Sequence, residues 1–181
     1  MEHMLRYLIE HGQVWVLEQR EVHRAGAIPI SQHLRTAFEP FFGGELLDST
    51  RFKAVSVIEN PGFYRELEAA GQSIPLDFTV MHGITFEDTV LLSERYLGED
   101  ELSPGILFHE LVHVVQYRQL GIAEFVTRYI RGWAENGYDY HAIPLERDAY
   151  RLQERYERNP DQPFSVSEEV AQRLGSGLED K

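Results

Sequence analysis

The sequence predicts an α+β fold in which helices come first, a small sheet follows and further helices complete the chain. Three observations carry this prediction: amphipathic helical periodicity over residues 1–42, a β-branched, extended texture between residues 52 and 92, and the return of helical periodicity from residue 103. This order differs from the strand–helix alternation of a parallel α/β sheet. We therefore expect a small mixed or antiparallel sheet packed on a buried helix.

The N-terminal part is expected to be helical, with a break at residues 26–29, Gly-Ala-Ile-Pro. Ser31 offers an N-cap for a second helix that ends near residues 41–44. We predict a strand over 52–58, then a turn at Asn60-Pro61-Gly62 and a short helix over 63–70 that stops at Gly71. Residues 1–44 are thus interpreted as a helical N-terminal extension of a core over 52–155.

Extended chain is predicted to continue at residues 78–81 and 84–86. The latter pairs with 89–92 as a hairpin whose connection, Glu87-Asp88, lacks a turn glycine. Helices follow over 103–120, 122–134 and 144–158, the first with a start signal at Ser103-Pro104. One domain then spans 1–158, and we expect the tail over 159–181 to be mobile apart from one short helix after Ser167.

The length and the net charge of the chain restrict the functions and partners that it can have. With 181 residues the chain can bury the core of one compact domain. Its net charge of −13 disfavours nucleic acid and anionic membrane surfaces as partners. No apolar run is long enough to be inserted in a membrane, and the first residues lack an export signal, so a cytoplasmic location is expected. Because there is no cysteine, any metal must be held by His, Asp or Glu.

The helix over 103–120 carries the residues with the clearest chemistry. His109 and His113 are four residues apart, so both imidazoles lie on one helix face and can bind a common ion. Glu110 lies next to them around the helix, where its carboxylate can reach a metal-bound water. This H-E-x-x-H spacing is typical of two zinc ligands and a general base. Burying these groups in an apolar helix is unfavourable unless a partner such as a dication compensates.

A catalytic zinc site usually has a third protein ligand. Gln116 and Gln119 stand where one common continuation of the motif has Gly and His, so the ligand is expected from a later helix. Glu146 lies in the first turn of the helix over 144–158, and Ala149 would let that helix pack close to the zinc helix. Asp148 and His141 are the alternatives, in that order.

Glu146 and Ala149 form a Glu-x-x-Ala pattern that resembles the gluzincin metallopeptidases. More narrowly, the sequence His109-Glu110-Leu111-Val112-His113-Val114-Val115-Gln116 and the segment 84–92 resemble the eCIS-core metallopeptidase domain. The likeness covers about residues 52–155. It implies a zincin-like fold and a Zn²⁺ site formed by His109, His113 and Glu146. Tyr150 stands where members often have an acidic residue that hydrogen-bonds a zinc histidine.

The corresponding hypothesis is hydrolysis of a peptide or protein substrate. A bound zinc ion lowers the pKa of water from about 15.7 towards 7, and Glu110 moves the proton from that water to the leaving amine. Tyr140 is our candidate donor to the oxyanion, with Tyr138 and His141 as alternatives. The ligand types favour zinc, although manganese, cobalt and iron also accept them.

Three other interpretations stay open at this level. The chain could be a catalytically silent zincin-like module that binds a metal or a partner. Both histidines could instead be packing residues of a metal-free core. A latent enzyme, with its site covered by the tail or the N-terminal helices, is the third. The oligomeric state cannot be read from the sequence.

Overall fold

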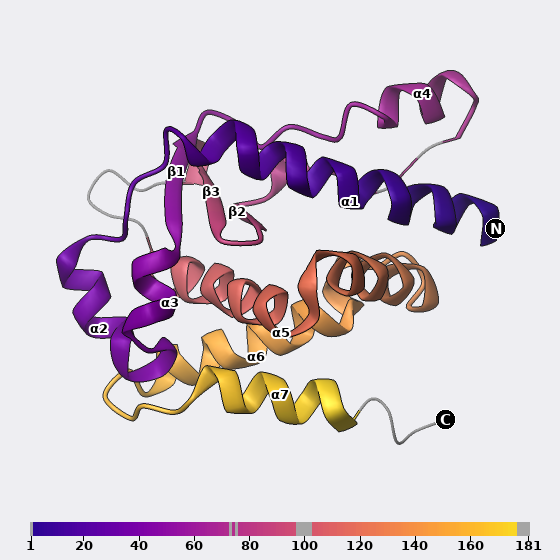
Figure 1. Ribbon diagram of the computed structural model, residues 1–181. Helices are drawn as coiled ribbons and strands as arrows, with labels where there is room; N and C mark the ends of the chain where they lie inside the picture. Colours follow the sequence, from indigo (N-terminus) through magenta and orange to yellow (C-terminus); the bar gives the residue numbers. More distant parts are fainter. Residues whose placement is uncertain (1, 73, 75, 97–102, 177–181) are drawn as a thin grey trace.

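The computed structural model describes residues 2–72, 74, 76–96 and 103–176 (Figure 1). It has the predicted α+β architecture, with helices before and after a small sheet. The elements in chain order are α1 (Glu2–Arg24), α2 (Gln32–Phe42), α3 (Gly44–Ser49), β1 (Arg51–Val55), α4 (Tyr64–Ala69), the 3₁₀ helix η1 (Phe78–Val80), β2 (Gly83–Phe86), β3 (Thr89–Ser93), η2 (Glu94–Tyr96), α5 (Pro104–Glu135), η3 (Tyr140–Ala142), α6 (Pro144–Arg158) and α7 (Val166–Ser176).

The sheet has the order β1-β3-β2 and is mixed, as predicted. β1 runs parallel to β3, with Arg51 opposite Thr89, whereas β2 pairs with β3 in an antiparallel hairpin. The hairpin turn contains no glycine, and Glu87 adopts the left-handed region at φ 59. β2 therefore forms one edge of the sheet, and within the described residues no strand pairs with its other side.

Helix α5 runs through the middle of the molecule, between the sheet and α1 on one side and α6 and α7 on the other (Figure 1). Two apolar clusters meet on it. One contains Phe38 and Phe41 of α2 together with Phe108, and the other joins Leu8 and Val16 of α1 to the second half of α5. The N-terminal helices thus supply part of the core, although we had interpreted them as an extension of it.

The two helices predicted over 103–120 and 122–134 form one element with a break at Gly121. This residue has φ 73 and ψ 165, a conformation that disfavours residues with a Cβ atom. The second half of α5 then reaches the start of α6. A Cβ atom at Gly132 would lie 2.6 Å from Pro144 Cδ, so a glycine is needed for this close approach.

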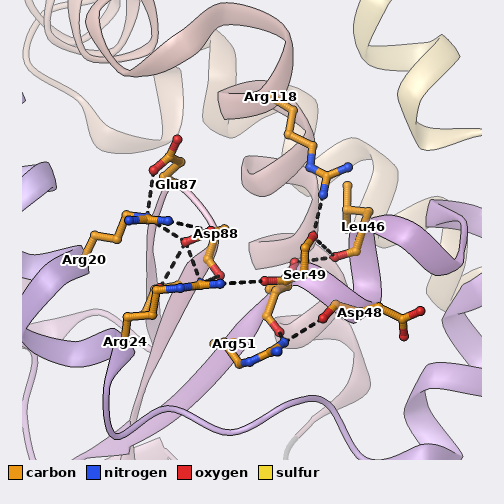
Figure 2. Close-up of polar contacts among 11 residues, drawn as sticks. Arg20, Arg24, Leu46, Asp48, Ser49, Arg51, Glu87, Asp88 and Arg118 are labelled. Atoms are coloured by element: carbon orange, nitrogen blue, oxygen red, sulfur yellow. Dashed lines mark hydrogen bonds and ion pairs between the residues drawn. The ribbon is translucent and has the colours of Figure 1, made fainter.

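An arginine network joins α1 to the hairpin (Figure 2). Arg20 Nε lies 2.8 Å from Asp88 Oδ1 and from Glu87 Oε2, and Arg24 Nη1 lies 2.8 Å from Asp88 Oδ1. Arg24 also donates to the backbone oxygen of Ser49 at the end of α3. These contacts fix α1 against both the β2–β3 turn and α3.

Two local predictions were wrong. Residues 78–80 form η1 and not a strand, because Asn60 Oδ1 accepts from the Phe78 N–H and Asp77 Oδ1 accepts from the Thr79 N–H. These side-chain acceptors stabilise a turn, and their effect outweighs the preference of the β-branched residues in this segment for a strand. At the start of α5, the Ser103 side chain makes no capping hydrogen bond, although Pro104 does occupy the first helical position.

The short helix predicted after Ser167 is present as α7 (Val166–Ser176), whose Val166 and Val170 are 0% and 2% exposed in the first apolar cluster. Glu169 pairs with Arg151 and Arg155 of α6. Helix periodicity places the two valines on one face, and their burial anchors the segment. Residues 177–181 of the predicted tail lie outside the described residues.

Within the part of the chain that the structure describes, none of the helices has both the length and the hydropathy needed to span a bilayer.

Candidate metal centre

Three predicted ligands converge between α5 and α6. His109 Nε2 and His113 Nε2 lie 3.1 Å apart, and Glu146 Oε2 is 3.0 Å from the first and 3.4 Å from the second. His109 and His113 come from successive turns of α5, and Glu146 from the first turn of α6. All three residues are buried, with 3–6% of their surface exposed. They form the group with metal-binding potential among the described residues.

The spacing of the three atoms fits a tetrahedral metal. Nitrogen and oxygen ligands about 2.0–2.1 Å from a zinc ion, at tetrahedral angles, are about 3.3 Å apart. The three observed distances bracket this value. Two imidazole nitrogens and one carboxylate oxygen also make the donor set of an open zinc site with a fourth position for water. The residues present therefore fit a zinc ion.

Two glutamine amides orient the histidines. Gln153 Oε1 lies 3.2 Å from His109 Nδ1, and Gln116 Oε1 lies 2.8 Å from His113 Nδ1. An amide oxygen can only accept, so each Nδ1 carries a hydrogen and each Nε2 is the nitrogen that faces the site of a metal. The sequence analysis missed both residues, and here they supply the hydrogen bonds that the resemblance expected from an acidic residue at position 150. Tyr150 instead packs its ring 4.4 Å from that of His109.

Gln116 also connects the two ligand helices. Its Nε2 donates to the backbone oxygen of Leu145, the residue before Glu146, at 3.0 Å. A single side chain thus holds His113 and the first turn of α6 in register. The feature of the sequence that could have indicated this role is the position of Gln116, one turn after His113 on the same helix face.

Glu146 has a second partner that the sequence analysis missed. The Tyr129 hydroxyl donates to Glu146 Oε1 at 2.7 Å, which leaves Oε2 facing the histidines. Burial by itself raises the pKa of Glu146, but the two imidazoles outweigh it and hold that pKa well below its ordinary value. For His113, burial lowers the pKa, whereas the Glu146 carboxylate raises it to about 9. A negative carboxylate therefore faces the imidazoles across the ligand triangle.

Glu110 points to the other side, towards strand β2. Its Oε2 accepts from Thr85 Oγ1 at 2.7 Å, and its backbone oxygen accepts from the same hydroxyl at 3.1 Å. A Cβ atom at Gly83 would lie 2.5 Å from Glu110 Oε1, so only glycine leaves room for this carboxylate. Burial raises the pKa of Glu110 above its ordinary value, against the lowering effect of the neighbouring imidazoles.

Tyr140 in η3 lies beside the ligands, at the border of both cavities described below. Burial and the nearby Glu146 carboxylate raise the pKa of its hydroxyl, which therefore stays protonated and able to donate. Tyr138, the alternative donor, is 42% exposed and packs its ring against Trp133.

The two alternative ligands lie elsewhere. Asp148 Oδ1 pairs with Arg173 of α7 at 2.8 Å, on a different face of α6 from Glu146. His141 borders the open cleft and packs its ring against those of Tyr140 and Tyr150. Neither belongs to the group that could hold a metal.

Two cavities adjoin the centre. An open cleft of about 610 Å³ is bordered by His109, Glu110 and Tyr140. A second, apolar cavity of about 90 Å³ starts at Glu110, His113 and Glu146 and continues between α1 and the second half of α5. Gly83 borders both.

The geometry of the site is the basis for a functional assignment, since comparisons of the chain with protein-family models, curated proteins and solved structures found no match.

Proposed function

We propose that this protein is a zinc-dependent peptidase in which His109, His113 and Glu146 hold the metal and Glu110 is the general base. The observation that carries the proposal is the separation of the four side chains into two groups. Three converge on one point at ligand spacing, while Glu110, one residue from a ligand, is held apart by Thr85. A purely structural ion would not need this fourth, separately positioned carboxylate.

When bound, zinc would polarise the substrate carbonyl and make water acidic enough to lose a proton near neutral pH. The chain's own residues supply the remaining functions. Glu110 takes the proton from the attacking water and passes it to the leaving nitrogen. Tyr140, protonated and at the border of the cleft, donates to the oxygen on which negative charge develops. Tyr129 keeps Glu146 oriented towards the ligand triangle throughout.

A peptide is the substrate class that the surroundings favour. β2, which carries Thr85 and Gly83, is an edge strand with one side of its backbone unpaired in the sheet. An extended peptide can add to such an edge through main-chain hydrogen bonds. The open cleft of about 610 Å³ is bordered by Gly83 of this strand and by Glu110, so a peptide lying along β2 would present its backbone to the general base.

The proposal is tested first by metal content. Mass spectrometry of the purified protein should find about one zinc per chain, and His113→Ala and Glu146→Ala should lose it or bind it more weakly. The zinc-loaded protein should then cleave members of a broad peptide library, with a rate lowered at least about 100-fold in Glu110→Gln.

The outcomes separate the remaining interpretations. Zinc binding without cleavage of any peptide would support a silent metal-binding module. A wild-type protein that takes up no zinc, even when zinc is supplied, would contradict the metal site and leave the histidines as packing residues.

A further inference from the structure

The apolar cavity next to Glu110 is not used by the chemistry proposed above. It adjoins the candidate metal centre and is covered by one face of α1, on which Leu8, Gly12 and Trp15 are spaced by four and three residues. The opposite wall comes from the second half of α5, with Val126, Ile130 and Trp133. The cavity therefore depends on the N-terminal helix, which the family resemblance does not include.

Its lining restricts what can bind. Among the described residues that line it, the acidic residues and the histidine are Glu110, His113 and Glu146, which lie together beside the candidate metal centre. The rest of the walls are almost entirely aliphatic and aromatic. A charged side chain would lose its hydration there without gaining a partner, whereas an apolar side chain would be removed from water.

The size of the cavity further limits which side chains it can bind. Its volume is about 90 Å³, smaller than the roughly 150 Å³ apolar cavity that accepts benzene in another protein. A leucine or methionine side chain suits this space, and a tryptophan side chain exceeds it. The cavity and the open cleft have Met81, Gly83, Glu110 and Tyr140 in common in their linings, so an occupant of the cavity would lie next to a peptide in the cleft.

Gly12 and Ile130 limit this space. A glycine inside a helix such as α1 is unfavourable, so its presence calls for a packing reason. A Cβ atom at Gly12 would lie 3.2 Å from Val126 Cγ1 and 3.4 Å from Ile130 Cδ1. The glycine lets α1 approach α5, and the Ile130 side chain then borders the cavity where the two helices meet.

We infer that this cavity is the specificity pocket of the proposed peptidase, and that it binds a leucine- or methionine-sized apolar side chain of the peptide, next to the cleaved bond. Ile130 is the residue that sets the upper size limit. The inference rests on the proposed function, and it adds the class of peptide that is cleaved and the residue that selects it.

The test uses the zinc-loaded full chain and a peptide series that differs only in the residue beside the cleaved bond. Leucine and methionine peptides should have a kcat/KM about 10-fold or more above those with glycine, aspartate or tryptophan. Ile130→Ala should raise kcat/KM for phenylalanine and tryptophan peptides and lower it for leucine peptides. Ile122→Ala is the matched control, because Ile122 lies on the same half of α5 but does not line the cavity. Its preference should equal that of the wild type.

A binding measurement keeps this inference separate from the proposed hydrolysis. Calorimetry on the zinc-loaded wild type should show tighter binding of hydroxamates with a leucine side chain than of hydroxamates with glycine, and Ile130→Ala should reverse the order of leucine and phenylalanine. Selective binding without peptide cleavage would uphold the pocket and contradict the hydrolysis. Cleavage without side-chain preference, or a preference that Ile130→Ala leaves unchanged, would overturn the pocket and leave the peptidase standing.

Discussion

Thr85 is the residue on which the position of the Glu110 carboxylate depends. It is 5% exposed, and its hydroxyl donates to Glu110 over a distance of 2.7 Å. Burial raises the pKa of Glu110, and the Thr85 hydrogen bond lowers it by stabilising the charged form. Thr85 therefore influences both where the base lies and the pH at which it loses its proton.

We expect Thr85→Val, which keeps the shape of the side chain, to lower kcat about 10-fold with unchanged zinc content. The pKa of Glu110 should rise further, so the acid limb of the pH–rate profile should move to higher pH. Thr85→Ser keeps the hydroxyl group, so it should have the kcat and the acid limb of the wild type. Equal pH profiles for the wild type and Thr85→Val would contradict the role assigned to this hydrogen bond.

Gln116 holds one of the proposed metal ligands, His113, in place. Because its amide links His113 to the backbone of Leu145, Gln116→Leu should free the imidazole and weaken zinc binding about 10- to 100-fold in competition with a chelator. The matched control is Gln119→Leu on the same helix, whose side chain bonds Ser167 of α7. Equal zinc affinities in the two variants would show that Gln116 does not orient His113.

At the scale of elements, Asp88 is the carboxylate of the hairpin that pairs with both Arg20 and Arg24 of α1. Burial raises the pKa of Asp88, but hydrogen bonding and charge from Arg20, with Arg24 beside it, hold the pKa below its ordinary value. A carboxyl group whose pKa is depressed by folding stabilises the native state above its unfolded pKa of about 3.9. That contribution is lost as the pH falls through the native-state pKa.

Asp88→Asn should consequently lower the free energy of unfolding by about 1 kcal/mol at pH 7, a magnitude typical of partly exposed ion pairs. The difference from the wild type should shrink as the pH is lowered below 4, where the wild-type carboxyl group is increasingly protonated. Urea unfolding at a series of pH values measures this, with the exposed Asp161→Asn as control. A difference that stays constant with pH would exclude the ion pairs as its cause.

At the scale of the whole molecule, the candidate metal centre joins α5 and α6, the two described elements that pack most extensively against each other. α5 carries two of the proposed ligands and α6 the third, so an ion bound there would link helices that are otherwise held by apolar contacts and by hydrogen bonds of Gln116, Tyr129 and Gln153. A ligand that binds only the native state stabilises it in proportion to the logarithm of its concentration over Kd. The stability of the fold should therefore depend on metal.

With free zinc at about 1,000 times its Kd, the free energy of unfolding should rise by about 4 kcal/mol and Tm by roughly 10 °C. A chelator should reverse the change, and His113→Ala should respond to neither addition. Thermal melts followed by circular dichroism measure this shift. A wild-type Tm that zinc and chelator leave unaltered would place the two histidines in a metal-free core.

Most elements of this fold could be predicted because their signals are local. Helix periodicity, the glycine at 121 and the proline at 104 lie within a few residues of the structure they determine. The spacing of His109, Glu110 and His113 is likewise a property of one helix. The misassigned strand at 78–81 and the packing of α7 show the limit, since the side chain of residue 60 determines the conformation of the first segment and α6 the position of the second.

The order of helices and strands, the two histidines of the site and the choice of Glu146 as a candidate ligand could thus be predicted from local sequence patterns. Which distant side chains meet them depends on how the chain packs in three dimensions. Thr85 lies 25 residues from Glu110, Tyr129 lies 17 from Glu146, and Gln153 lies 44 from His109. Such contacts, and the cavity that α1 covers, follow from the packing of the whole chain, because no periodicity within one segment specifies which side chains of another segment will face it.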